Sequence, residues 1–256
     1  PVRQMERGRK TLFVLGVYAS AVHARWVDDK GSLIVNALAV ASEPEIFWRG
    51  GGAAELISQV TVPHGAGRLV PASKMLNGPS GVTLDDAFLS PLLRSQGVGR
   101  EEAWLCDLLP ESRCNAKQAE AIKREYVPRM ERFGLPAYEY PPVPSELADA
   151  TRIGEIEQEV LEASPAIVVT LGDLPLKWFA SKYGAHSNLA AYGETERDYG
   201  RLHRIEIGGH RTLLLPLVHP RQAGRLGSHS PKWSVLHTYW TREIAESLLD
   251  SITAEE

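Results

Sequence analysis

The sequence has few cysteines: Cys106 and Cys114 are the only two among 256 residues. Two thiols supply neither a four-cysteine zinc site, a four-cysteine iron–sulfur cluster nor a disulfide framework. No apolar run approaches the roughly 20 residues of a membrane-spanning helix. The charged first ten residues have no apolar stretch behind them, unlike a signal peptide. We therefore expect a cytoplasmic protein with no membrane partner, no metal and no cofactor.

Glycine-rich phosphate-binding motifs are also missing, because neither the dinucleotide pattern nor the P-loop pattern occurs. A serine hydrolase could in principle use Ser20, Asp107 and His219. The sequence has no Gly-x-Ser-x-Gly elbow, however, which argues against that reaction class.

An excess of positive charge is absent as well, since the net charge is −4. At first sight this argues against a nucleic-acid partner. The charge is unevenly distributed, because residues 197–242 carry eight basic and two acidic side chains and five of the eight histidines. A polyanion responds to the local field, so this segment could face phosphates. Alternatively, it is a solvated basic face that balances acidic helices.

Short apolar runs alternate with segments of helical periodicity along most of the chain. This alternation predicts an α/β protein, residues 1–256 forming a single domain, with a mostly parallel sheet covered on both faces. The Gly208-Gly209 pair predicts an antiparallel hairpin at the edge of the sheet. The expected strands are residues 12–18, 33–41, 103–109, 166–171, 202–207 and 212–218. The expected helices are residues 84–93, 115–133, 151–163, 174–183 and 231–249.

Polar residues stand where three of these strands end, which is where ligands bind in open α/β sheets. Gly16 opens a predicted turn that runs to Ser20, in which Tyr18 could stack on a flat ring. Asp107 ends an apolar strand, where a carboxylate is costly unless it is paired or functional. His219 follows the last strand and could donate a hydrogen bond or exchange a proton. The structural alternatives are a packed tyrosine turn, a loop-capping carboxylate and a backbone-bonded histidine.

Four segments resemble motifs of the uracil-DNA glycosylase superfamily. They are residues 12–20 (LFVLGVYAS), 103–115 (AWLCDLLPESRCN), 166–177 (AIVVTLGDLPLK) and 213–224 (LLLPLVHPRQAG). The resemblance implies a three-layer α/β/α fold around a central, mostly parallel four-stranded sheet. It also implies an enzyme that takes a deaminated or damaged base out of the DNA stack and hydrolyses its N-glycosidic bond.

The resemblance assigns roles residue by residue. Asp107 and His219 become the catalytic candidates, the first reading the base edge and the second stabilising the departing base. The base-binding candidates in the first motif are Gly16, Val17, Tyr18 and Ser20. Asn77 and Ser80, in an Asn-Gly-Pro-Ser-Gly cluster, could form a second lip of the pocket or a surface turn. The DNA-binding candidates are Arg221, Arg225, His229 and Lys232.

This chain has Val17 and Tyr18 where many members of the superfamily place an acid or an asparagine. The attacking water is therefore assigned either to Asp107 or to the first-motif turn. Two alternatives remain open: a non-catalytic relative that binds nucleic acid or a nucleotide, and a hydrolase of free nucleosides. The partner is then DNA or a nucleobase ligand, and we expect a monomer.

Overall fold

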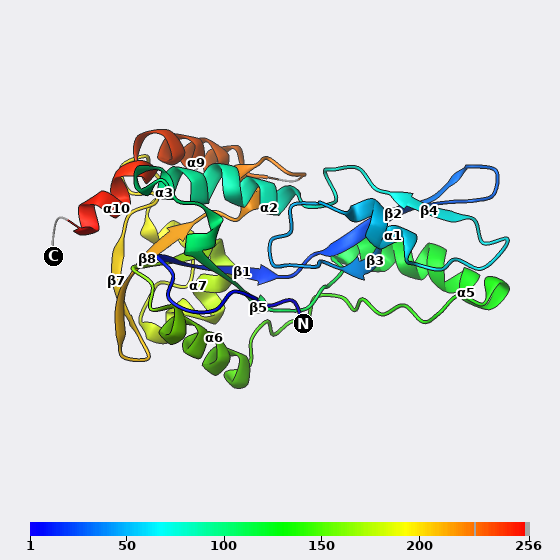
Figure 1. Ribbon diagram of the computed structural model, residues 1–256, viewed down its shortest axis with the longest axis horizontal. Coiled ribbons are helices and arrows are strands. Elements are labelled where there is room, and N and C mark those ends of the chain that lie inside the picture. Colours follow the sequence, from blue (N-terminus) through cyan, green and yellow to red (C-terminus); the bar gives the residue numbers. More distant parts are fainter. Residues whose placement is uncertain (228, 254–256) are drawn as a thin grey trace. The chain divides into compact units, whose positions relative to one another are not determined.

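The computed structural model describes residues 1–227 and 229–253. Its internal contacts divide the chain into two compact units. Unit 1 comprises Pro1–Val2, Tyr18–Pro79 and Glu111–Ser145, and unit 2 comprises Arg3–Val17, Ser80–Pro110 and Glu146–Glu256. Unit 1 is thus built mainly from two long segments inserted into the sequence of unit 2 (Figure 1). The single domain expected from the sequence stays a prediction.

Unit 2 contains a five-stranded sheet in the order β5-β1-β6-β8-β7. Its strands are β1 (Leu12–Tyr18), β5 (Ala103–Leu109), β6 (Ile167–Leu171), β7 (His203–Ile207) and β8 (His210–Leu217). The pairs β1–β6 and β6–β8 are parallel, and β7 is antiparallel to β8 at the edge. The α/β class, the mostly parallel sheet and the edge hairpin are therefore confirmed.

The sheet forms where the sequence has continuous apolar runs, as expected of strands covered on both faces. All five residues of β6 are buried. The hairpin turns at Gly208 and Gly209, which both have positive φ. Two-residue hairpin turns require this backbone conformation, and glycine adopts it without a steric penalty.

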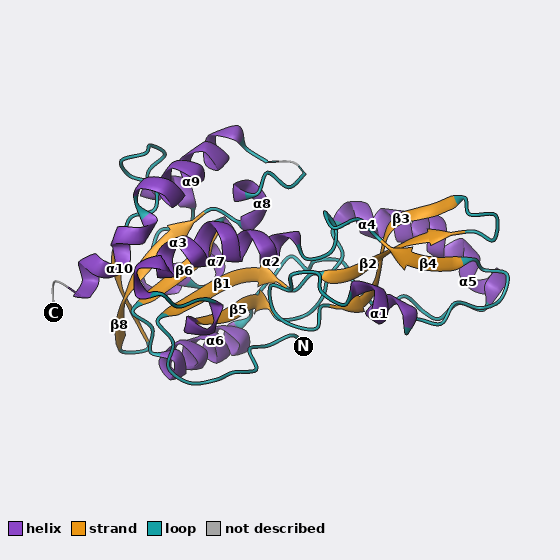
Figure 2. Cartoon of the chain, turned by 45° about the horizontal axis from the view of Figure 1, so that its top comes forward, coloured by secondary structure: helices purple, strands orange, loops and turns teal. Residues whose placement is uncertain are grey.

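Helices of unit 2 lie on both sides of the sheet, with α6 on one side and α3 and α9 on the other (Figures 1 and 2). The helices are α2 (Pro79–Leu84), α3 (Ser90–Leu93), α6 (Ala150–Ala163), α7 (Asp173–Trp178), α8 (Pro220–Ala223), α9 (Pro231–Glu243) and α10 (Ala245–Thr253). A π-helical segment, η1 (Asp85–Leu89), joins α2 to α3. Short 3₁₀ segments are η2 (Arg94–Gln96), η3 (Arg100–Glu102), η5 (Ala180–Tyr183) and η6 (Leu189–Tyr192).

Two helices differ from the sequence-based expectation. The helix expected at residues 84–93 begins at Pro79, whose ring suits the first helical turn because no intrahelical bond needs its N–H. The helix expected at residues 174–183 is divided into α7 and η5. Gly172 is the N-cap residue of α7, and Asp173 accepts a hydrogen bond from the Leu189 N–H at 2.7 Å.

Unit 1 contains a separate three-stranded antiparallel sheet in the order β3-β2-β4. Its elements are β2 (Ala21–Val27), β3 (Leu33–Ser42), β4 (Arg68–Pro71), α1 (Ala53–Ser58), α4 (Ala116–Ala121), η4 (Ile122–Tyr126) and α5 (Val127–Phe133). The strand expected at residues 33–41 therefore exists, but in this second sheet. The sequence analysis missed β2 and β4.

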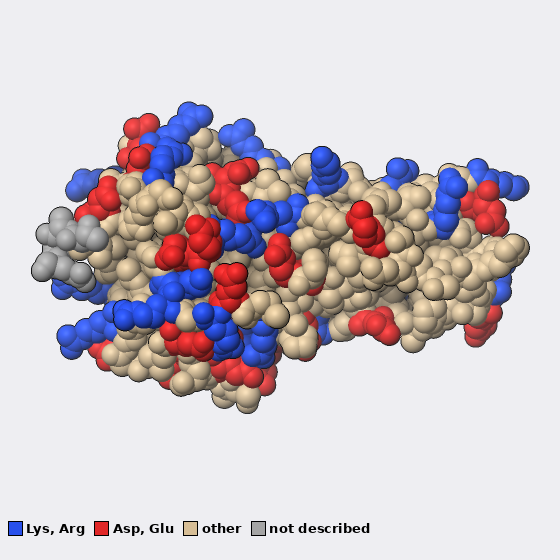
Figure 3. All heavy atoms as spheres, in the orientation of Figure 1, with Lys and Arg blue, Asp and Glu red and all other residues tan. Residues whose placement is uncertain are grey.

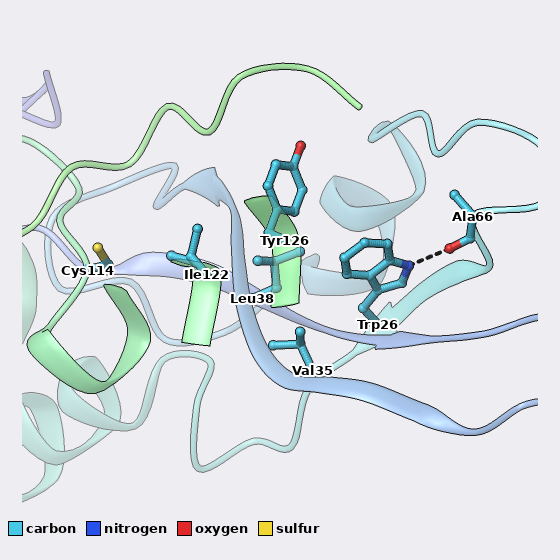
Figure 4. Packing of buried hydrophobic residues seen from close by; sticks show 7 residues of the cluster. All are labelled: Trp26, Val35, Leu38, Ala66, Cys114, Ile122 and Tyr126. Atoms are coloured by element: carbon cyan, nitrogen blue, oxygen red, sulfur yellow. Dashed lines mark hydrogen bonds between the residues drawn. The ribbon is translucent and has the colours of Figure 1, made fainter. Parts of the chain in front are cut away.

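Trp26 lies at the centre of the unit 1 core (Figure 4). Its indole N–H donates to the Ala66 carbonyl at 2.7 Å. Val35 and Leu38 of β3 and Tyr126 of η4 pack around it. A buried indole with a satisfied N–H is well suited to hold the sheet against the helix.

The helix of unit 1 runs from Ala116 to Phe133, close to the bounds expected from the sequence, and continues through Pro128. Asn115 caps it and forms a reciprocal capping box with Gln118. The π-helical segment η4 lies directly before Pro128. A π-bulge changes the local hydrogen-bond register, which allows the helix to accommodate a residue without an N–H.

Candidate functional site

Asp107 of β5 is a buried carboxyl group, with the residue only 3% exposed. Among the residues that the structure describes, no hydrogen bond to its carboxyl oxygens occurs, and neither oxygen is one of the fully buried atoms that lack a partner. Burial raises the pKa of this carboxyl to about 7, and the nearby Arg152 charge opposes the shift. Asp107 can therefore carry or release a proton near neutral pH.

The side chain of Asp107 points away from α6. Trp104 and Cys106, on the opposite face of β5, contact Glu159 and Arg152 of α6. Successive strand residues alternate between the two faces of a sheet, so Asp107 lies on the other face. Phe13 of β1 stacks on Trp104, with ring centroids 6.4 Å apart, which places Gly16 on the Asp107 face. Gly16 thus adds no side chain beside this carboxyl.

Arg152 of α6 holds the backbone of β5 in place. Its guanidinium donates to the carbonyls of Asp107 at 2.7 Å and Leu108 at 3.2 Å. It also contacts the Cys106 sulfur at 3.1 Å and pairs with the Glu159 carboxylate at 3.0 Å. We missed this positioning residue in the sequence. The available signal was an arginine with Glu155 and Glu159 three and seven positions later on one helix face.

His219 lies just after β8 and caps the short helix α8. Its Nδ1 accepts the Arg221 backbone N–H at 3.1 Å. A ring nitrogen that accepts is unprotonated, so the neutral imidazole carries its proton on Nε2. Burial and the Arg221 charge lower the pKa of His219 to about 4. His219 is therefore a neutral hydrogen-bond donor at physiological pH, and its general acid–base role is disfavoured.

Gly172, at the end of β6, lies against His219. Its φ of +87° favours glycine, and an added Cβ would be in van der Waals contact, 3.4 Å from the His219 Cβ. Gly224, in the loop after β8, allows that loop to approach α2 closely. An added Cβ would lie 2.6 Å from Thr83 Oγ1 of α2. The loop after β8 is consequently packed against both β6 and α2.

Asp107 and His219 belong to strands that are separated by β1 and β6 in the sheet. Neighbouring strands are about 4.8 Å apart, so β5 and β8 are about 14 Å apart. The sheet thus carries both residues, with two strands between them.

The turn expected from Gly16 to Ser20 is largely absent. Gly16, Val17 and Tyr18 are strand residues, and only Ala19 and Ser20 lie between β1 and β2. The Ser20 N–H donates to Glu43 at 3.1 Å, and its carbonyl accepts from the Ser112 hydroxyl. β1 therefore extends through Tyr18, and two residues connect it to β2. Whether these four candidates bind a base stays a prediction.

Asn77 and Ser80 have different surroundings. The Asn77 amide accepts from the His23 N–H at 2.7 Å and donates to the His23 carbonyl at 2.9 Å. The Asn77 side-chain amide thus forms with the backbone of β2 the two hydrogen bonds that a paired strand would form. Ser80 lies in the first turn of α2, in unit 2. These contacts give Asn77 a structural role, but as a buried residue rather than as part of a surface turn.

Gly78→Ala is expected to lower the free energy of unfolding by about 2–4 kcal/mol. Gly78 has φ +80°, and an added Cβ would lie 2.1 Å from the Arg49 carbonyl carbon. Chemical denaturation measures the change. Gly31→Ala is the matched control, because Gly31 has φ +85° and open space around it. Equal losses in the two variants would contradict the importance of this backbone contact.

The four DNA-binding candidates all lie in unit 2. Arg221 donates to the Leu226 carbonyl at 3.4 Å, and His229 contacts the Gly227 carbonyl at 3.0 Å. Lys232 forms an ion pair with Glu194 at 2.6 Å. Arg225 is exposed. On the face shown in Figure 3, basic and acidic side chains of unit 2 are interspersed. A phosphate would thus have to compete with Glu194 for Lys232.

Comparison with known proteins gives no match: no protein-family model and no curated protein sequence matches the chain. Within residues 1–227 and 229–253, no three His, Cys, Asp or Glu side chains cluster as a metal ion would require. Among the helices that the structure describes, none has the length and apolar character needed to cross a membrane.

Proposed function

We propose that unit 2 binds a nucleobase and hydrolyses the N-glycosidic bond of a deaminated or damaged base in DNA. The four segments that resemble the uracil-DNA glycosylase superfamily contain β1, β5, β6 and β8. These four strands are neighbours in one sheet, in the order β5-β1-β6-β8. A common sheet supports reading the four short resemblances as parts of one fold.

The observation that carries the proposal is the pair formed by Asp107 and His219. One is a buried carboxyl without a hydrogen-bond partner among the described residues, and the other is a neutral donor held by its own loop. Perturbed titratable groups at strand ends are typical of functional sites. The carboxyl group of Asp107, which has no hydrogen-bond partner among the described residues, could bind a polar ligand.

In the proposed reaction, water attacks the sugar C1′ and the bond from C1′ to the base nitrogen breaks. The bonding electron pair stays with the base, which departs as an anion. The Nε2–H of His219 donates to the base oxygen on which this charge collects. Asp107 holds another edge of the base, and the proton of the attacking water passes to solvent. No step requires an added oxidant or reductant.

Oligonucleotides that carry uracil, hypoxanthine, xanthine or alkylated bases, in single and double strands, test the proposal. We expect abasic sites from at least one substrate, and their loss in Asp107→Ala and His219→Ala. Asp86→Ala is the control, since Asp86 is an exposed acid of η1. Salt-sensitive DNA binding without base release would indicate the non-catalytic relative instead. Turnover of free nucleosides without DNA binding would indicate the nucleoside hydrolase.

A further inference from the structure

We propose that the base-binding site selects a base with an amidine edge, an exocyclic amino group beside an unprotonated ring nitrogen, as in cytosine and its 5-substituted forms. This inference rests on the proposed function. It follows from the chemical identity and surroundings of Asp107, together with the tautomer of His219. It predicts that uracil, whose edge is an imide, is the poorer substrate.

The first argument concerns the hydrogen-bond pattern of the carboxyl group. An ionised carboxylate only accepts, whereas a protonated one has a donor and an acceptor side by side. The protonated form matches an amidine edge, because its O–H donates to the ring nitrogen and its carbonyl accepts from the amino group. The imide of uracil also offers one donor and one acceptor, but its acceptor is a carbonyl oxygen, which is a much weaker base than an amidine nitrogen and binds the same O–H less strongly.

The second argument concerns the proton that this pairing requires. Burial brings the pKa of Asp107 to about 7, and Arg152 is the charged group of unit 2 that acts against the shift. Glu155 and Glu159, the carboxylates that pair with Arg152 at 2.9 Å and 3.0 Å, both belong to α6. His219 is neutral. A proton can therefore be held between Asp107 and an amidine nitrogen at neutral pH at little cost.

The third argument concerns His219, which follows β8. The Nε2–H of His219 needs an acceptor. Cytosine carries a 2-oxo group on the side of the ring adjacent to its amidine edge. A 4-amino-2-oxopyrimidine thus satisfies Asp107 and His219 together, which a base lacking an exocyclic oxygen does not.

The test uses the full chain and duplexes with one cytosine, 5-methylcytosine or uracil, each placed opposite an abasic analogue so that base pairing does not differ. We expect kcat/KM for the cytosine-type bases to exceed that for uracil by about 10- to 100-fold. Above pH 7, kcat/KM for cytosine should fall about tenfold per pH unit, because only protonated Asp107 pairs with it.

Asp107→Asn is the matched variant, because an amide always carries a donor and an acceptor and does not titrate. We expect it to remove the decline above pH 7 and to bring the cytosine-to-uracil ratio close to one. Wild-type protein that releases uracil as fast as cytosine at every pH would overturn the inference and leave the glycosylase function standing. Absence of base release from all substrates, including those tested above, would overturn both. The wild-type pH profile decides the matter even where Asp107→Asn fails to fold.

Discussion

Replacing His219 with alanine is expected to slow base release about 10²- to 10³-fold, the usual effect of removing one donor from a developing anion. The ring donates through Nε2 because Nδ1 is occupied by the Arg221 N–H. The free energy of unfolding should fall by no more than about 1 kcal/mol, the value of a lost helix cap. Single-turnover kinetics with the best substrate, alongside chemical denaturation, separate the two effects.

His210→Ala is the control for this prediction. His210 begins β8, at the other end of the strand, and its Nε2 contacts the Pro165 carbonyl at 3.0 Å. Its loss should leave the rate of base release unchanged. Because the pKa of His219 is about 4, we also expect no decline of the His219-dependent rate enhancement between pH 8 and pH 5. A decline centred near pH 6.5 would show an ordinary titrating histidine and contradict the assigned tautomer.

The sheet of unit 2 was largely predictable from the sequence because β1, β5 and β6 are continuous apolar runs with local boundaries, whereas the edge strand β7 alternates polar and apolar residues. The apolar runs at residues 12–18 and 103–109 form β1 and β5 with the predicted bounds. Gly208 and Gly209 form the predicted hairpin turn. Burial on both faces makes such runs apolar without alternation, which is why they stand out.

The sheet of unit 1 was less visible. β2 pairs with β4 more than 40 residues later, and their register depends on contacts that no local pattern records. Asn77 shows the same limitation at the level of one side chain. Its sequence context predicts a surface turn, whereas its amide completes hydrogen bonds with His23 of β2. Long-range pairing of this kind overrides local turn preference.

Asp107 and His219 could be singled out from the sequence because they are polar residues at the ends of apolar strands. Their protonation states could not, because these depend on burial and on a backbone N–H contributed by the loop itself. The sequence left open whether His219 donates a hydrogen bond or exchanges a proton near neutral pH, and its surroundings favour the neutral donor. The hydrogen bonds that hold β5 come from α6, more than 40 residues away in the chain.

Arg152→Leu is therefore expected to lower the free energy of unfolding by about 3–5 kcal/mol, the usual cost of breaking a buried ion pair. Arg152 is 8% exposed and Glu159 is 6% exposed. The substitution leaves the Glu159 carboxylate buried without a compensating charge, although the Trp104 indole N–H still donates to it at 2.9 Å. It also removes both hydrogen bonds to the backbone carbonyls of β5. Chemical denaturation followed by tryptophan fluorescence measures the loss.

Arg94→Leu provides the comparison, because Arg94 pairs with Glu246 at 3.2 Å while both side chains are more than half exposed. An exposed pair of this kind contributes less than about 1 kcal/mol. Adding Glu159→Gln to Arg152→Leu should restore part of the lost stability, since it removes the uncompensated charge. Because the Arg152 charge lowers the pKa of Asp107, its removal should also shift the Asp107-dependent pH profile upward. Equal stability losses in Arg152→Leu and Arg94→Leu, with an unshifted profile, would show that Arg152 does not position the candidate site.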